Sequence, residues 1–420
     1  MTSNVSPARP AAVRFVLITV ALDMLALGVV IPVLPDLFKS FLGGDTVSAA
    51  HYYGIAGVLW ASMQFLFSPL LGALSDRFGR RKIILFSNAG LGLDYVLMAL
   101  SGSLLWLFIA RAVSGICAAS VSTASAYIAD VTPPEKRAAA FGSIGAAFGI
   151  GFVLGPAVGG TLGAIDLHLP FWVAAGLSLA NFCYGWFVLP ESLPPEKRAG
   201  FSWARANPVG GLIWLAGHGR LLGLAGVHFL NSLAHYVLPA TFALYAGYRY
   251  QWSPSEIGLT LMMVGVCSAA VQGGLVRVVI PRIGERHALM LGLLFGGLGF
   301  ALYGLANQGT WFLAAIPVMA IWGFAGPAMQ GLMSGRVEST DQGKLQGMLS
   351  SVMGVAGMIG PGLFTQIFAA SIHPDAHWHV PGAAFLLSAA FLAAALLLAY
   401  RVANQTVPLI RPDTEGTVRT

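Results

Sequence analysis

Charge is scarce in this chain: Asp, Glu, Lys and Arg make up 10% of 420 residues, whereas soluble domains carry about 25%. With 56% hydrophobic residues, this scarcity excludes an ordinary soluble globular protein. Only three cysteines occur, all in apolar stretches, and their odd number and spacing predict neither a disulfide framework nor a metal site. The chain also lacks a G-x-x-x-x-G-K-[ST] phosphate loop and any nucleophile–base constellation, so we expect no ATP-driven pump, no enzyme and no cofactor.

What the chain has instead is a series of long apolar stretches. Each is long enough for a helix that crosses a bilayer, which needs about 20 residues. We therefore predict an all-α membrane protein with twelve transmembrane helices. The predicted helices cover residues 13–38, 51–75, 83–103, 104–128, 138–163, 170–189, 220–246, 256–280, 287–306, 311–334, 343–370 and 381–401.

The basic residues are distributed unequally between the two sides of this pattern. Of 23 Lys and Arg residues, 20 fall on one side, Lys39 and Arg249 on the other, and Arg111 inside a stretch. The positive-inside rule then predicts that both termini are cytoplasmic. The pI of about 9.3 could indicate nucleic-acid binding, but bases in short loops favour contact with anionic lipid and no nucleic acid. The first apolar stretch is a full span without a cleavage pattern, so no signal peptide is expected.

The chain repeats itself at an offset of 205 residues. Gly79 corresponds to Gly284, Arg81 to Arg286, Gly142 to Gly347, and Gly155-Pro156 to Gly360-Pro361. Two parallel six-helix repeats are typical of secondary transporters whose binding site lies at the midplane between them. We expect two pseudo-symmetric six-helix bundles at 1–189 and 220–420, joined by a proline-containing cytoplasmic linker at 190–219.

The loop after the second stretch reads G-A-L-S-D-R-F-G-R-R, from Gly72 to Arg81. The string and the Lys82 that follows it hold one acid and four bases, and the acid can pair with an arginine or with a helix N-terminus. Basic residues alone would indicate only topology, but this ordered string resembles the loop signature of the major facilitator superfamily. The resemblance implies that Asp76 and Arg80 latch the two halves on the cytoplasmic side, with Asp130 as a partner. The expected latch comprises Asp76, Arg77, Gly79, Arg80, Arg81 and Asp130. Pro281 replaces Asp76 in the second repeat, which predicts an asymmetric latch.

The fifth stretch contains G-F-V-L-G-P-A-V-G-G, from Gly151 to Gly160. Glycines four residues apart allow helices to approach closely, and Pro156 bends the segment. Close packing by Gly151, Gly155, Pro156 and Gly159 would alone explain the string. It is also similar to a motif of the exporters in this superfamily, and that resemblance favours export.

The likeness narrows to the twelve-span drug/proton antiporters, and within them to the tetracycline/proton antiporters. It is carried by L-D-M-L-A-L-G-V-V-I-P-V-L-P (22–35), G-L-G-L-D-Y-V-L-M-A (90–99), E-I-G-L-T-L (256–261), G-E-R-H-A-L-M-L-G (284–292) and Q-G-K-L-Q-G (342–347), and covers nearly the whole chain. The family carries an acid in helix 9 and a histidine in helix 8, where this chain has Gly296 and Ser268. This departure predicts that tetracycline is a poor substrate.

Three ionisable residues fall near mid-depth in the first half. At about 1.5 Å per residue, Asp23 lies roughly 15 Å and Asp94 roughly 16 Å from the cytoplasmic ends of their helices, and Arg111 roughly 12 Å from the outer face. An ionised group there costs about 2.5–3.5 kcal/mol, so it is rarely kept without a function. We take Asp23, Asp94 and Arg111 as candidates for proton coupling. Asp94 could instead belong to a structural pair, and Arg111 could bind an anionic group or hold Asp23 ionised.

The second half offers His228 and His235, seven residues apart and so on one helix face, with Asn231 between them. These three are candidates for the substrate cavity, although a neutral histidine can also be an ordinary interhelical hydrogen-bonding residue.

Together these observations predict a monomeric, proton-coupled antiporter of the bacterial inner membrane. Its partners would be protons, lipid and a small amphipathic compound that it exports by alternating access. The alternatives are a proton-coupled importer or facilitator of a metabolite, and a sensor that transports nothing.

Overall fold

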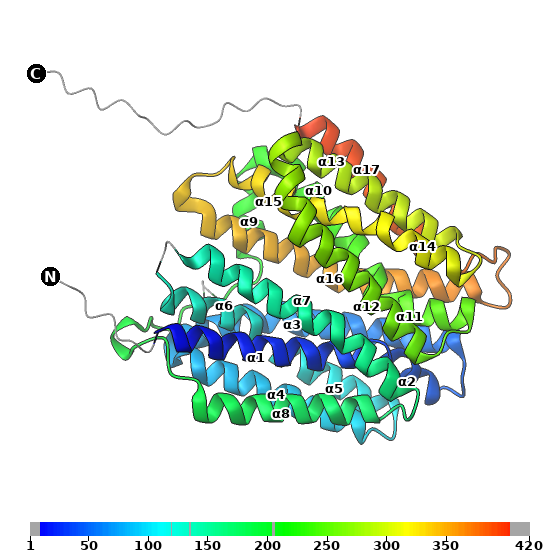
Figure 1. Ribbon diagram of the computed structural model, residues 1–420, viewed down its shortest axis with the longest axis horizontal. Coiled ribbons are helices and arrows are strands. Elements are labelled where there is room, and N and C mark those ends of the chain that lie inside the picture. The colour runs from blue at the N-terminus through cyan, green and yellow to red at the C-terminus, as the bar shows by residue number, and fades with distance from the viewer. Residues whose placement is uncertain (1–8, 119, 134–135, 204–205, 404–420) are drawn as a thin grey trace, which may run out of the picture.

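The computed structural model describes residues 9–118, 120–133, 136–203 and 206–403, and these residues form helices and connecting segments without a strand. The first half, below the second in Figure 1, contains α1 (Arg9–Val30), α2 (Leu34–Ser40), α3 (Thr46–Phe78), α4 (Arg80–Ala99), α5 (Leu104–Cys117), α6 (Ser120–Val131), α7 (Arg137–Gly163) and α8 (Leu169–Val188). After the short helix α9 (Gly210–Ala216), the second half contains α10 (Gly219–His235), α11 (Val237–Tyr250), α12 (Pro254–Ala270), the π-helix η3 (Val271–Leu275), α13 (Val276–Leu305), α14 (Gly309–Ala320), the 3-10 turn η4 (Ile321–Phe324), α15 (Ala325–Ser334), α16 (Gln342–Ile372) and α17 (Ala383–Ala403).

Eleven continuous stretches of the described residues are long and apolar enough to cross a bilayer, and one of them holds two spans. Pro254–Leu305 has 52 residues, or about 78 Å of helix, more than twice the roughly 30 Å of a hydrocarbon core. The helix geometry breaks inside it at Gly284, where φ is 78° and ψ is 158°. The prediction of twelve spans is therefore confirmed.

The two halves reproduce the repeat in backbone detail. Gly79 and Gly284, which are 205 residues apart, both have a positive φ, of 102° and 78°. Glycine is needed at both positions because a side chain is strained in that conformation. Pro156 and Pro361 lie inside the corresponding helices α7 and α16. The shared turn and the shared proline indicate that the sequence repeat is a structural repeat.

One helix start and one additional helix are notable differences from the sequence-based prediction. α3 begins at Thr46 rather than at residue 51, because the Asp45 carboxylate accepts hydrogen bonds from the backbone N–H groups of Val47 and Ser48. Hydrogen bonds with Ser48 lower the pKa of Asp45. α9 lies in the segment expected to be a linker and packs on α16, where Gly211 lies against the backbone of Met348.

The halves meet along two helix pairs, α7 with α12 and α3 with α16. We call the end of the molecule that carries the loop from Arg77 to Lys82 the basic end. At the opposite end these pairs are tightly packed: Gly160 lies against Pro254 and Gly258, and the His51 Nδ1 and Gln366 Oε1 atoms are 2.8 Å apart. No side chain beyond hydrogen fits at Gly160, so this end is closed.

The same helix pairs separate toward the basic end. Toward the basic end, the last glycines in close contact across the two pairs are Gly265 of α12, which lies against Val153 of α7, and Gly354 of α16, which lies against Phe65 of α3. Beyond them, a Cβ atom added at any of the following positions would meet no heavy atom within 4 Å: Gly142, Gly145, Gly149, Gly273, Gly274, Gly343 and Gly347. The close glycine contacts between the halves therefore end at mid-length, and the side toward the basic end is open.

Candidate substrate and coupling sites

The glycines of α7 place this helix against α1. A Cβ atom added at Gly155 would lie 2.6 Å from the Cα of Gly28, so the two glycines are in close contact. Gly151 packs on Met24 and Leu25. Gly159 continues the row against Val29, whereas Pro156 also contacts Gly258 of α12 on the other side. The glycine string thus lets one helix pack within its own half and across to the other half.

Asp23 lies inside the first half, between α1, α4 and α8. Only 3% of its surface is exposed, and its Oδ1 accepts a 2.7 Å hydrogen bond from Asn181 Nδ2 of α8. When the Asn88 amide of α4 is oriented to satisfy its neighbours, its nitrogen donates to Oδ1 and Oδ2 of Asp23, at 3.1 and 3.2 Å. Asp23 therefore lies in the interior of the first half, with its side chain turned toward α4 and α8.

Asp94 and Arg111 form a buried ion pair that joins α4 to α5. Arg111 Nη2 lies 3.1 Å from Asp94 Oδ2 and 3.2 Å from the sulfur of Met98. Asp94 has no exposed surface, and its Oδ1 has no hydrogen-bond partner among the described residues. The arginine thus pairs with Asp94, which agrees with the alternative that Asp94 belongs to a structural pair.

The polar residues of α10 lie closer to the inter-half space. His235 is exposed near the middle of the span Gly219–Tyr250, and its ring lies 5.5 Å from that of Trp322 in η4. The Trp322 indole N–H donates a 2.8 Å hydrogen bond to Asn231 Oδ1. His228 is half-buried, with Nε2 3.3 Å from the Leu349 carbonyl oxygen, so it bridges α10 and α16. The sequence analysis did not single out Trp322 as a partner of this stripe.

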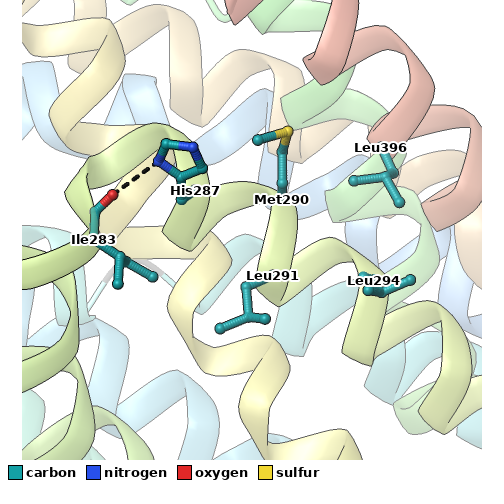
Figure 2. A pocket seen from close by; sticks show the side chains of 6 residues that line it. All are labelled: Ile283, His287, Met290, Leu291, Leu294 and Leu396. Carbon is teal, nitrogen blue, oxygen red and sulfur yellow. Dashed lines mark hydrogen bonds between the residues drawn. The ribbon is translucent and has the colours of Figure 1, made fainter.

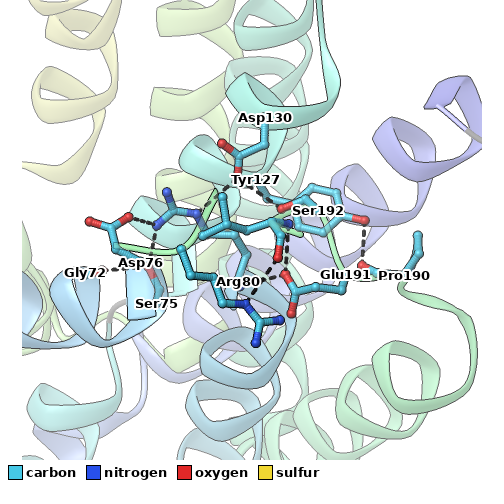
Figure 3. A network of polar contacts seen from close by, with 11 residues as sticks. Gly72, Ser75, Asp76, Arg80, Tyr127, Asp130, Pro190, Glu191 and Ser192 are labelled. Atoms are coloured by element: carbon cyan, nitrogen blue, oxygen red, sulfur yellow. Dashed lines mark hydrogen bonds and ion pairs between the residues drawn. The ribbon is translucent and has the colours of Figure 1, made fainter. Parts of the chain in front are cut away.

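The basic loop forms a network around Arg80 (Figure 3). Its guanidinium lies 2.6 Å from Asp76 Oδ1 and 3.1 Å from Asp130 Oδ2, and it donates to the Ser75 hydroxyl. Ser192 also donates to Asp130, and Tyr127 donates to the Pro190 carbonyl. Among the described residues, the side-chain ion pairs and hydrogen bonds of Asp76, Arg80 and Asp130 stay within the first half and the connecting segment. The expected latch between halves is thus not made in this state; the network holds the first half to the connecting segment.

Glu191 is the member of this network that sequence reasoning missed. Its Oε1 accepts from the Arg80 backbone N–H at 2.9 Å, and its carboxylate occupies the space beside Gly79. α4 begins with Arg80, Arg81 and Lys82, which is unfavourable because a helix N-terminus is already positive. That excess of bases was the signal that an acid from elsewhere was needed. Arg77 lies over the ring of Phe78, and Arg81 donates to the Trp186 carbonyl.

A groove of about 610 Å³ lies between α13 and α17 within the second half (Figure 2). Figure 2 shows His287 at one end and Met290, Leu291 and Leu294 along α13, facing Leu396. Because it has no residue of the first half and almost no polar surface, it lacks the features of an inter-half substrate site. No cluster of three metal-ligating side chains occurs in the part of the chain that the structure describes.

Comparison with known proteins agrees with this architecture. The family model of the Major Facilitator Superfamily matches residues 16–222 and 224–418. The chain belongs to this superfamily. As a major facilitator protein it is 39% identical over 360 residues to the class C tetracycline resistance protein of Escherichia coli, covering 86% of this chain and 90% of the relative. It is 32% identical to the class H protein of Pasteurella multocida over 94% of the chain and 98% of the relative. The resemblance to tetracycline antiporters is confirmed by these relatives.

Solved structures of the superfamily share the fold. The human organic anion transporter MFSD10 (TETRAN) has a TM-score of 0.69 and 25% identity, over 94% of this chain and all of that one. A bacterial homologue of the lysosomal transporter Spinster, in an inward-facing, unoccupied conformation, has a TM-score of 0.74 and 16% identity, over 94% and 97%. At that identity, the second likeness supports the fold alone.

Proposed function

We propose that this major facilitator protein is a proton-coupled antiporter that exports a small amphipathic compound from the bacterial cytoplasm. We call the contact between the halves along α7–α12 and α3–α16 the seam. The observation that carries the proposal is that the seam is asymmetric, because glycine contacts close it at one end and it is open at the other. Such a seam is what alternating access requires, because the same two helix pairs can pack at one end or at the other. The relatives named as tetracycline resistance proteins support export of a drug-like molecule.

The orientation follows from charge. The basic end carries the Arg and Lys residues of the loops, so the positive-inside rule places it and both termini in the cytoplasm of a bacterial inner membrane. The open space of this state then faces the cytoplasm, where an exporter takes up its substrate. We propose that residues 1–189 and 220–420 rock against each other, with 190–219 as the connecting segment, and that the protein acts as a monomer.

Asp23 is the proposed proton carrier. Asp94 is already paired with Arg111, whereas the Asp23 carboxylate accepts hydrogen bonds from the Asn181 amide and, in the orientation that satisfies its neighbours, from the Asn88 amide. Moving one charge through about 150 mV provides about 3.5 kcal/mol. At about 1.4 kcal/mol per tenfold, this supports roughly a 300-fold gradient of a neutral substrate.

Everted membrane vesicles test the proposal. With an imposed proton gradient that makes the vesicle lumen acidic, protons leave the lumen in exchange for substrate, so wild-type vesicles should accumulate a lipophilic fluorescent substrate, and dissipating the gradient with a protonophore should release it. Accumulation that is insensitive to the protonophore would contradict proton coupling. Uptake only into right-side-out vesicles would instead support the importer.

A further inference from the structure

Three polar side chains and one indole form a wall at the point where the halves part. We call this the Trp322 wall: His235 and Asn231 from α10, Trp322 from η4, and Gln272 from η3. Trp322 is bonded to Asn231 and stands 5.5 Å from His235. Gln272 lies beside Gly323, because a Cβ atom added at Gly323 would be 3.2 Å from the Gln272 Cγ. We infer that this wall contacts the transported compound, and that the compound is a planar aromatic molecule without a positive charge. This inference rests on the proposed export function.

The position of the wall follows from the seam. Gly265 of α12 packs on α7 through Val153, and Gln272 is seven residues further toward the basic end, a spacing that keeps residues of a helix on one face. Gln272 and His235 are both exposed. An imidazole exposed near mid-span would be costly against lipid, so these side chains face the polar space between the halves.

The backbone is irregular at the same level. η3 is a π-helix between α12 and α13, and η4 is a 3-10 turn between α14 and α15, and the two are in contact. Such breaks inside long helices occur frequently at functional sites, because they redirect side chains and free backbone groups. Here they bring Trp322 and Gln272 to one surface.

The preference for a flat molecule comes from how Trp322 is seated. A Cβ added to Gly296 would lie 2.6 Å from Trp322 Cδ1 and 2.9 Å from Leu392 Cδ1, so the indole occupies the space that a side chain at residue 296 would need. Its N–H is bonded to Asn231, which fixes the ring plane. A fixed indole beside an imidazole offers an aromatic surface for stacking, and the Gln272 amide offers hydrogen bonds.

The charge preference comes from the placement of the acids. Among the described residues, the only carboxylates at mid-depth are Asp23 and Asp94, and both are sealed inside the first half. The acids of the second half lie outside its apolar core, for example Glu256 in a capping box at the opposite end and Glu285 at the basic end. The cation–π attraction of one indole is smaller than the cost of desolvating a cation, so a cation would be unfavourable here.

Binding to the purified full chain in nanodiscs tests the inference with three fluorescent probes. Phenylnaphthylamine is neutral, anilinonaphthalene sulfonate is its anionic counterpart, and ethidium is a planar cation. We expect saturable binding of phenylnaphthylamine and none of ethidium. Trp322→Leu should weaken phenylnaphthylamine binding about tenfold, since stacking on one aromatic ring is worth about that factor. Trp311→Leu is the matched control, because Trp311 is exposed at the start of α14.

Further variants separate contact from structure. Trp322→Phe keeps an aromatic face but loses the bond to Asn231, so it should weaken binding less than Trp322→Leu. His235→Ala should also weaken binding, whereas His287→Ala, at the basic end of α13, should not. Replacing Gly296 with Asp and Trp322 with Ala in one chain supplies both an acid and the space for it, and this variant should gain ethidium binding.

The outcomes distinguish this inference from the proposed function. Ethidium binding as tight as that of phenylnaphthylamine, equal losses in Trp322→Leu and Trp311→Leu, or no binding of either naphthyl probe would overturn the inference. Uphill export of ethidium by the wild type would overturn it while upholding proton-coupled export. The expected binding pattern without any gradient-driven transport would uphold the wall and reject the exporter.

Discussion

The two halves share a backbone repeat but use their membrane-embedded polar residues differently. The first half holds Asp23, Asp94 and Arg111 in its interior, bonded to residues of the same half. Among the described residues, the second half has no acid at that depth; it has instead an exposed His235 whose ring lies beside that of Trp322. From this difference we infer that the two halves have separate roles: the first half carries the proton and the second half recognises the compound.

The largest expected effect comes from Asp23. Asp23→Asn keeps a side chain of the same shape in the cluster with Asn88 and Asn181, so the protein should fold. It removes the titratable group, so uphill transport in vesicles should be lost while exchange down a gradient persists. Asp375→Asn, at an exposed loop position, is the control. A variant that still concentrates substrate would show that another residue carries the proton.

Arg111 tests whether the other buried acid is structural. Arg111→Ala would leave Asp94 buried and unpaired, and breaking such a pair costs about 3–5 kcal/mol of stability. Replacing both residues, Asp94→Asn with Arg111→Met, should cost much less, because no lone charge remains. Thermal unfolding in detergent measures both, with Lys344→Ala in the exposed pair with Asp341 as the control. Equal melting temperatures of Arg111→Ala and wild type would contradict the structural pair.

The seam can be broken at either end. Gly258→Leu would collide with Pro156 and Gly160, so the opposite end should no longer close. Gly142→Leu meets nothing in this state and should leave that end closed, interfering only when the basic end closes. Labelling of a cysteine introduced at Ser253 by a thiol reagent from the outside reports the difference. We expect faster labelling in Gly258→Leu alone, and similar rates in both variants would contradict the closed opposite end.

The smallest expected effect concerns the basic loop. Asp76→Asn removes one of the two carboxylates that hold Arg80, in a partly exposed pair. Turnover should slow several-fold, with substrate affinity almost unchanged, because the network lies far from the Trp322 wall. Initial export rates and binding titrations on the same preparation measure both quantities. A changed affinity with normal turnover would argue against a role in closure.

Much of this architecture could be predicted from the sequence, because lipid imposes simple rules. Span length, loop charge and the 205-residue repeat predicted twelve helices, and Gly79 with Gly284 marked the two equivalent turns. What could not be predicted was the direction of side chains around nearly uniformly apolar helices. α1 is hydrophobic all round, so its sequence did not show that Asp23 turns toward Asn181 rather than toward the inter-half space.

Contacts between distant segments were the other gap. The sequence left a structural pair as one alternative for Asp94 but did not identify Arg111 as its partner, since only tertiary packing brings α4 and α5 into register. Trp322 gave no signal among ten tryptophans, because its role depends on η4 and on the space left by Gly296. In each case the sequence shows that the residue is present, but its contact partner depends on how each helix is rotated about its axis.

The most direct test of the division between the halves compares Asp23→Asn and Trp322→Leu in one assay. Substrate-driven proton flux and substrate affinity are measured together in proteoliposomes carrying each variant. The account predicts that Asp23→Asn abolishes proton flux at unchanged affinity, whereas Trp322→Leu raises the substrate concentration required but keeps the number of protons moved per substrate. If both variants lose affinity and coupling together, recognition and proton transfer share one site and the division is wrong.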